Sequence, residues 1–280
     1  MKKKLLITLG CSYTEGVGCY DESLFKSKTL DGLKTEVLHP DIAPLHRKSF
    51  HKKGWPNKLG KLMGYHKVIN MGLASSSTAG QMKSFYELYY NDKFEDYETT
   101  IIWLLPDASR FAMYSSGVVR NMMPSYLSQS TTKNWLGYSL TKGYIEFIND
   151  SSVDPLLDQL FYVKTMEQYC QNNNFNLILT HVEYKADCLL KFYHKSPYYI
   201  TSEPTRFLLG PDHPKKETSP ICGHPNEFGY QVMAEKMYKL IEKNHSHILP
   251  KTPASEDEFE WEYGGYGLCF ITPTHKTLMG

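Results

Sequence analysis

The sequence lacks the features that mark a membrane protein or a secreted protein. No apolar run in its 280 residues approaches the about 18 residues that a membrane-spanning helix needs. The first residues, Met1 to Lys4, are basic like the start of a signal peptide, but the apolar stretch after them ends at Leu9 and is too short for a signal-peptide core. We therefore expect a cytoplasmic protein that contacts no membrane.

Paired cysteines and an excess of one charge are missing as well. The six cysteines are scattered without a Cys-x-x-Cys pair, which favours reduced thiols over a disulfide framework or a metal site. The formal net charge is +1, so composition indicates no surface for nucleic acid. No glycine-rich nucleotide-binding loop follows a predicted strand. We expect no cofactor, no metal and no nucleic-acid partner, and the sequence leaves the oligomeric state open.

The apolar pattern predicts strands that alternate with helices. Continuous apolar runs indicate buried strands, and apolar positions three or four residues apart indicate helices. The predicted strands span residues 4–9, 66–72, 99–105 and 175–183, and the predicted helices span residues 55–64, 79–90, 155–172 and 225–242. This alternation implies parallel strands joined by right-handed crossovers, and so a three-layer α/β/α sandwich around a central parallel sheet.

Three segments fall outside this alternation. Polar stretches at about 20–53 and 108–150 are interpreted as insertions into a single domain of residues 1–249, and residues 250–280 as a C-terminal appendage. Structureless loops of such length are uncommon unless functional, so we expect the insertions to set specificity. The first insertion contains three histidines without metal-ligand spacing, expected in a solvated loop: His39, His46 and His51.

Polar residues follow the predicted strands at the edge where parallel sheets bind ligands. This edge gathers Ser12, the 72–78 loop, Asp107 to Arg110, and His181 with Glu183. These segments lie far apart in the sequence, so their convergence would build a site. Asp107 and Arg110 are candidate substrate contacts.

The stretch Gly10-x-Ser12-x-Thr14-x-Gly16 directly follows the first predicted strand. Gly10 would let the chain turn tightly, and the next helix would direct its first N–H groups toward Ser12. Serine needs a neighbouring base, most often histidine, and donors for the oxyanion before it acts as a nucleophile. From this stretch alone, Ser12 is either such a nucleophile or, like Thr14, a helix N-cap.

A second stretch, His224-Pro-Asn-x-x-Gly-Tyr, precedes the last predicted helix. If that helix packs beside the first strand, His224 can approach Ser12. The two stretches together resemble the SGNH (GDSL-like) hydrolase family, and "VINMGLASSS" looks like the second block of that family. Cys11, where the family has Asp, makes the chain look more similar to a phage-associated branch than to the secreted lipases.

The resemblance covers roughly residues 4–110 and 155–245, and it implies an SGNH or flavodoxin-like fold. It also implies that Ser12 is the nucleophile and His224 the general base, with the backbone N–H of Ser12 as one oxyanion donor. The oxyanion-hole glycine of the family aligns near Ser75, or else at Gly72. Only a backbone N–H is needed there, so Ser75 can still serve.

The chain departs from the family pattern where the family has an asparagine oxyanion donor. That place is occupied by "LLPDASR", which contains no asparagine. An ionised Asp107 would repel an oxyanion, and Arg110 or Ser109 would have to donate instead.

A second departure concerns the acid that orients the histidine. It should lie two or three residues before His224, where the chain has Ile221 and Cys222. Asp212 is the candidate third triad member, and Glu217, Glu183 or a backbone carbonyl are alternatives. Loss of the orienting carboxylate lowers kcat by about 10⁴ in serine proteases, so this departure bears directly on activity.

The resemblance implies a serine esterase that cleaves a short acyl ester, such as a carbohydrate O-acetyl group, through an acyl-serine intermediate. The partner would be a small-molecule or glycan ester. Acyl transfer to another hydroxyl would use the same Ser-His pair. A catalytically degenerate module that binds glycans is the alternative favoured by the missing acid and asparagine. A nucleotide-binding α/β protein is a third interpretation, disfavoured by the missing glycine-rich loops.

Overall fold

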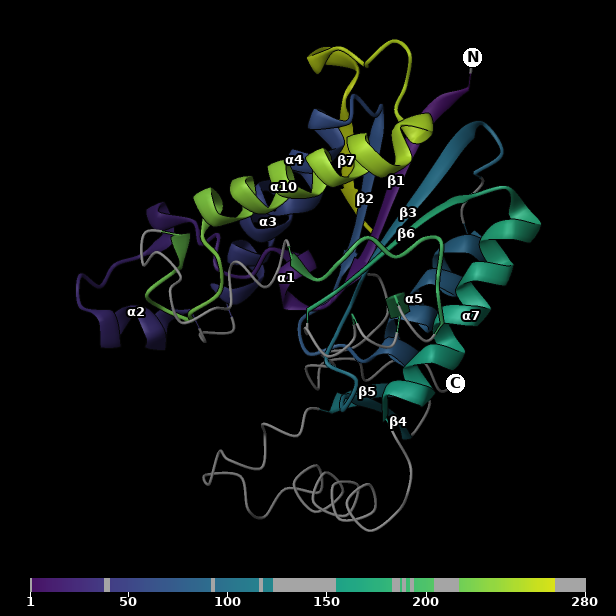
Figure 1. Cartoon of the computed structure of the whole chain (residues 1–280). Helices are drawn as coiled ribbons and strands as arrows, with labels where there is room; N and C mark the ends of the chain where they lie inside the picture. The colour runs from purple at the N-terminus through teal and green to yellow at the C-terminus, as the bar shows by residue number, and fades with distance from the viewer. Residues whose placement is uncertain are drawn as a thin grey trace, which may run out of the picture.

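The computed structural model describes residues 2–37, 41–91, 94–115, 118–122, 155–182, 187, 190–191, 194–203 and 217–264. Five parallel strands form the central sheet in the order β6-β3-β1-β2-β7 (Figure 1). Their bounds are β1 (Lys3–Gly10), β2 (Lys67–Gly72), β3 (Tyr97–Leu105), β6 (Asn176–His181) and β7 (Glu260–Tyr263). The predicted α/β sandwich with a central parallel sheet is confirmed.

Helices cover both faces of the sheet (Figure 1). One face carries α3 (Ala43–Lys53), α4 (Trp55–Leu62) and α10 (Glu227–His245), and the other carries α5 (Thr78–Asn91) and α7 (Pro155–Asn173). Successive side chains of a strand point to opposite faces. Along β1, Ile7 therefore packs toward α5 and α7, whereas Leu6 packs toward α4 and α10, and both are fully buried.

The structure forms each of the eight strands and helices expected from the apolar pattern, with bounds that shift by at most three residues. Strand β3 is a continuous apolar run because helices cover both of its faces. Helix α4 begins with Pro56 in its first turn, where a missing N–H is harmless. Strong local patterns therefore predict the scaffold well.

The remaining described elements are short or lie in the less regular segments. They are α1 (Ser12–Glu15), η1 (Glu22–Leu24), α2 (Leu30–Glu36), β4 (Phe111–Ser115), β5 (Val118–Met122), η6 (Ser246–Ile248) and η7 (Glu256–Glu258). The expected insertion at 20–53 contains α2 and α3, and β4 and β5 form an antiparallel hairpin within 108–150. Residues 123–150 of the second insertion lie outside the described residues.

The segment interpreted as an appendage supplies part of the sheet. Strand β7 pairs in parallel with β2 and forms the sheet edge, with Trp261 opposite Val68. The sequence pattern of this segment is short and acidic, so it carries no apolar run that would predict a buried strand. The half-buried pattern of β7 agrees with its edge position.

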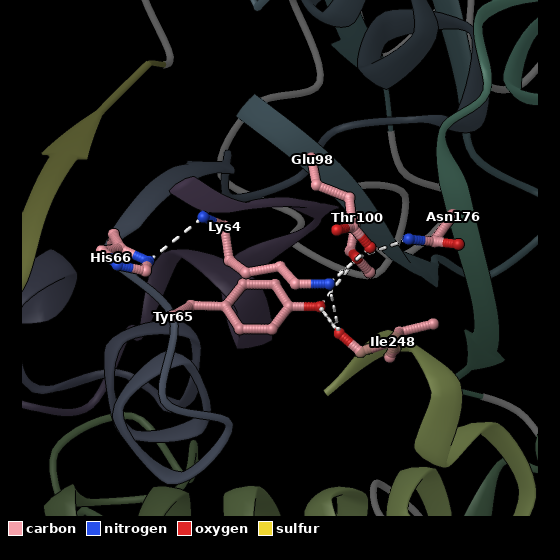
Figure 2. Close-up of polar contacts among 7 residues, drawn as sticks. All are labelled: Lys4, Tyr65, His66, Glu98, Thr100, Asn176 and Ile248. Atoms are coloured by element: carbon pink, nitrogen blue, oxygen red, sulfur yellow. Dashed lines mark hydrogen bonds and ion pairs between the residues drawn. The ribbon is translucent and has the colours of Figure 1, made fainter. Parts of the chain in front are cut away.

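A polar cluster ties the chain together at the amino-terminal edge of the sheet (Figure 2). The Lys4 amine pairs with the Glu98 carboxylate and donates to the carbonyl of Ile248. The Tyr65 hydroxyl also donates to Ile248, at 3.0 Å, and lies 2.8 Å from the Thr100 hydroxyl. These contacts anchor η6, which follows α10, against β1 and β3.

In the described part of the chain, no helix combines the length and the apolar character that crossing a bilayer requires.

We predict that the α5 face toward the sheet contributes strongly to folding. Phe85 is 0% exposed, and replacing it with alanine should lower the free energy of unfolding by about 3–5 kcal/mol, because the ring leaves a cavity. Tyr90, on the same helix, is 83% exposed and gives the matched control. Tyr90→Ala should change the stability by no more than about 0.5 kcal/mol in denaturant unfolding. Equal losses in both variants would contradict the observed packing.

Candidate active site

Ser12 lies directly beyond the carboxyl end of the central strand β1. It is the first residue of the short helix α1, and its side chain is nearly buried, with 8% of the residue exposed. A Cβ on Gly10 would lie 2.0 Å from the Thr14 hydroxyl, so Gly10 is required for the close return of α1 onto the strand end. The first N–H groups of a helix have no acceptor within the helix, which leaves the N–H of Ser12 available for other partners.

His224 is held by a tight loop before α10. Its backbone carbonyl accepts a hydrogen bond from the N–H of Ser219 at 2.8 Å, and Pro225 pairs with Thr218 in an antiparallel bridge. The Asn226 side chain accepts from the N–H of Gly229 and so caps α10. The helix therefore begins at Glu227, after the cap, and the loop before it presents the imidazole at the sheet edge.

The two sequence blocks meet in a direct contact. The Nε2 atom of His224 lies 2.9 Å from the Oγ atom of Ser12. Gly18 makes this approach possible: its φ of 111° suits glycine, and a Cβ there would lie 2.2 Å from the carbonyl oxygen of Pro225. The Tyr13 ring packs against the imidazole with 5.3 Å between ring centroids. The serine and the histidine are thus within hydrogen-bond reach and held in place by their neighbours.

No carboxylate among the described residues orients the His224 ring. The Nδ1 atom of His224 is buried and has no hydrogen-bond partner in that part of the chain. Asp212 and Glu183 lie outside the described residues, and the Glu217 carboxylate makes no hydrogen bond to the Nδ1 atom. The backbone carbonyl of Cys222 acts on the ring electrostatically, although it falls outside hydrogen-bond geometry. A backbone carbonyl was one of the alternatives that the sequence left open.

The surroundings hold the pKa of His224 below its ordinary value. Burial is the largest cause, because it disfavours the charged imidazolium. The Cys222 carbonyl opposes this and raises the pKa, the Arg110 guanidinium lowers it, and the Glu15 carboxylate raises it. His224 is therefore mostly neutral near pH 7, which is the form that accepts a proton.

The 72–78 loop lies beside α1. The N–H of Gly72 donates to the side-chain oxygen of Asn70 at 2.8 Å, so this N–H is already used and does not favour Gly72 as an oxyanion donor. Ser75 has a φ of 66°, in the left-handed region. The neighbouring Ser76 hydroxyl donates to the carbonyl of Gly10 at 3.1 Å, which holds the loop against the end of β1.

Glu15 is a buried carboxylate that no motif in the sequence indicates. It is 1% exposed, and it accepts hydrogen bonds from Arg47 Nε and from the N–H of Ala74, each at 2.6 Å. His51 Nε2 lies 3.8 Å away. Burial alone raises the pKa of Glu15, but His51, Arg47 and Ala74 together lower it below its usual value. Glu15 therefore carries its charge at neutral pH and joins α1, α3 and the 72–78 loop.

Two of the three histidines in the first insertion are buried, not solvated as expected. His51 stacks on the Tyr263 ring, with 3.6 Å between centroids, and burial lowers its pKa. His46 packs among aromatic rings, and its Nδ1 atom accepts from the N–H of Asp21 at 3.1 Å. The expectation of a solvated loop was wrong, because the spacing of histidines in a sequence does not show whether the polar segment that carries them folds back onto the sheet. His39 lies outside the described residues.

Of the other residues predicted at the carboxyl edge of the sheet, some belong to the core and some lie near the site. His181 is fully buried and shares a hydrogen bond with Gln159, 2.9 Å from its Nε2 atom, so it belongs to the core. Asp107 accepts hydrogen bonds from the N–H and the hydroxyl of Ser109. Arg110 acts electrostatically on His224 and Tyr13. No group of three or more described His, Cys, Asp or Glu side chains is arranged to hold a metal ion.

We predict that Glu15→Gln lowers the free energy of unfolding by about 1–3 kcal/mol at neutral pH, because the buried partners of the carboxylate lose an acceptor and a charge. Since the pKa of Glu15 is lowered by folding, its contribution is present at neutral pH and is lost as the pH falls through that lowered pKa. The difference between the variant and the wild type should therefore shrink in acid.

Glu87→Gln is the matched control, because Glu87 forms a more exposed ion pair with Lys83 at 3.3 Å. It should change the stability by no more than about 0.5 kcal/mol. Denaturant unfolding of the three proteins at neutral and acidic pH gives the measurement. A Glu15→Gln variant as stable as the wild type would argue against a charged Glu15.

No protein-family model and no curated protein matches the sequence. Several solved structures are similar to the fold, among them the following two. One is a protein of Desulfitobacterium hafniense DCB-2 assigned to the G-D-S-L family of lipolytic proteins, with 13% identity, a TM-score of 0.43, and coverage of 85% of this chain and 99% of that chain. The other is an acetyl xylan esterase from the rumen bacterium Butyrivibrio proteoclasticus, with 12% identity, a TM-score of 0.44, and coverage of 87% and 64%. Similarity this low transfers no residue roles and no substrate to this chain.

Proposed function

We propose that the protein is a serine esterase in which Ser12 is the nucleophile and His224 the general base. The observation that carries the proposal is the 2.9 Å distance between Ser12 Oγ and His224 Nε2. The two residues come from opposite ends of the chain and meet at the carboxyl edge of a parallel sheet, where such folds bind ligands. A serine hydroxyl paired with a largely neutral histidine is the arrangement that activates the hydroxyl for attack.

The reaction proceeds in two balanced halves. As Ser12 Oγ bonds to the ester carbonyl carbon, His224 Nε2 takes the hydroxyl proton. The tetrahedral intermediate then expels the alcohol, which receives that proton, and an acyl-serine remains. In the second half, a water molecule attacks the acyl carbon and gives a proton to His224. The acid leaves, and Ser12 recovers its proton from the imidazolium.

The oxyanion donors in this proposal are the backbone N–H groups of Ser12 and Ser75. Backbone donors that are fixed before the reaction stabilise the developing negative charge without reorganising. The Ser76 hydroxyl bond to Gly10 and the Glu15 bond to Ala74 hold the loop that carries Ser75. Gly72 is the weaker candidate, because its N–H donates to Asn70.

The proposed substrate is a short acyl ester, and a carbohydrate O-acetyl group is one such ester. Transfer of the acyl group to a second hydroxyl would follow the same steps with an alcohol in place of water. The His224 Nδ1 atom has no partner among the described residues, which favours a second candidate, a binding module with the pair retained but inactive. The family membership and the phage-associated branch both stay predictions.

We predict that a fluorophosphonate probe labels the purified wild type. Ser12→Ala removes the nucleophile and His224→Ala removes its base, so labelling should disappear in the first variant and fall by at least about 100-fold in rate in the second. Ser23→Ala and His247→Ala change exposed residues of the same types, and both controls should label like the wild type. A folded wild type that stays unlabelled would contradict the esterase and favour the binding module.

We also predict the acidic limb of the pH profile. The proton-accepting form of His224 is neutral, and its pKa lies below the ordinary value. Activity should therefore be retained as the pH falls to the ordinary histidine pKa of about 6.5, and the acidic limb of kcat/KM should lie below it. Initial rates on a short-chain nitrophenyl ester from pH 4.5 to 9 measure this limb. A limb above pH 7 would show that His224 is not the titrating base.

A further inference from the structure

Arg110 lies in the turn that follows β3, the strand next to β1. Its N–H donates to the carbonyl of Asp107 at 3.2 Å, which closes the turn. The carboxylate nearest in sequence, that of Asp107, accepts from the N–H and hydroxyl of Ser109 at 2.7 and 2.6 Å. The carboxyl ends of β1 and β3 lie at the same edge of the sheet, so the turn places Arg110 beside the Ser12 region.

No carboxylate among the described residues pairs with the Arg110 guanidinium. Its Nη1 atom is buried without a hydrogen bond, and the side chain forms no ion pair with any of the described residues. A guanidinium keeps its charge at all accessible pH values. Arg110 as a whole is partly exposed, so the cost falls on the buried Nη1 atom, which has lost its contact with water and gained no acceptor. This arrangement is expected where a ligand supplies the missing anion.

The unpaired charge also opposes the proposed reaction. It lowers the pKa of both His224 and Tyr13, so it acts directly on the imidazole that must become positive when it takes the serine proton. A second positive charge beside that imidazolium raises the cost of the step. An anion bound at Arg110 would remove this penalty and satisfy the buried Nη1 atom at the same time.

We propose, on the basis of the esterase function, that Arg110 binds a fixed negative charge of the substrate, so that the natural substrate is an ester that also carries a carboxylate, phosphate or sulfate. The planar guanidinium fork matches the oxygens of these groups and can bond to two of them at once. Ser12 then attacks the ester carbonyl of the same molecule. Arg110 is a specificity-determining residue in this assignment, and the backbone N–H groups remain the oxyanion donors.

The first experiment compares two nitrophenyl esters that differ at the far end of the acyl chain, a carboxylate in one and its methyl ester in the other. The nitrophenyl ester of adipic acid carries a free carboxylate, and the nitrophenyl ester of monomethyl adipate is its neutral match. The wild type should prefer the anionic ester in kcat/KM, and Arg110→Gln should reduce the ratio of the two values by about 10- to 100-fold, the range expected for a charge-assisted hydrogen bond. Arg110→Lys should retain part of the ratio. Lys53→Gln, which removes a more exposed cation, should leave the ratio unchanged.

Two outcomes of this comparison would overturn the proposal. One is a wild type without preference for the anionic ester. The other is an equal loss of kcat/KM on both esters in Arg110→Gln. That result would mean that Arg110 stabilises the oxyanion or the fold and does not bind a charge of the substrate.

The second experiment does not need activity. In Ser12→Ala, the pKa of the His224 imidazole is followed by NMR with and without inorganic phosphate, sulfate or acetate. Bound anion should raise this pKa, and adding Arg110→Gln to the variant should raise the starting value and abolish the response. An unchanged response in the double variant would overturn the proposal. The protein could show a response that depends on Arg110 and yet hydrolyse neither ester. That result would support the anion site and contradict the esterase function. The relative effects of the three anions identify the charged group that fits.

Discussion

The buried carboxylate of Glu15 is the constraint on which the arrangement of the site depends. A negative charge that is 1% exposed must be balanced by neighbouring groups, and Arg47, His51 and the N–H of Ala74 provide that balance. The requirement joins three segments that lie far apart in the sequence. Helix α1 presents Ser12, helix α3 supplies the basic groups, and the 72–78 loop presents Ser75. The Ser76 hydroxyl bond to Gly10 also holds the loop, but the carboxylate is the one group that contacts all three segments.

The same electrostatic reasoning explains the unusual surroundings of His224. In a Ser-His-Asp triad, a carboxylate orients the imidazole and stabilises the imidazolium. Here the Cys222 carbonyl and the more distant Glu15 favour the charged ring, while burial and Arg110 disfavour it. The balance keeps the imidazole neutral at rest, which suits a base, but leaves the imidazolium weakly supported. An anionic substrate beside Arg110 would supply the missing negative charge during catalysis only.

Polar contacts fix the late part of the chain at both ends of the sheet. At the amino-terminal edge, Lys4 and Tyr65 both donate to the carbonyl of Ile248, directly after α10 (Figure 2). At the other side of the molecule, His51 stacks on Tyr263 at the end of β7. Residues 246–263 therefore complete the sheet and contact the Glu15 cluster through His51. A segment with little apolar character of its own is placed by these contacts.

The amino-acid sequence alone was enough to predict four of the five strands, the helices α4, α5, α7 and α10, and the two blocks that carry Ser12 and His224. Local apolar periodicity and glycine-bounded turns determine those features over a few residues each. It could not show that β7 joins the sheet, because an edge strand needs only backbone pairing and a half-buried face. It could not show what surrounds the imidazole either.

The tertiary structure decided the electrostatics of the site. Glu15, Arg47 and His51 look like ordinary polar residues in the sequence, and only folding buries Glu15 and His51 and brings the partly exposed Arg47 against them. Arg110 is likewise one basic residue among many until the fold buries its Nη1 atom beside His224. Charge balance depends on distance and burial, which a linear pattern does not contain. The sequence therefore determined which residues could react, and the tertiary structure decided which charges act on them.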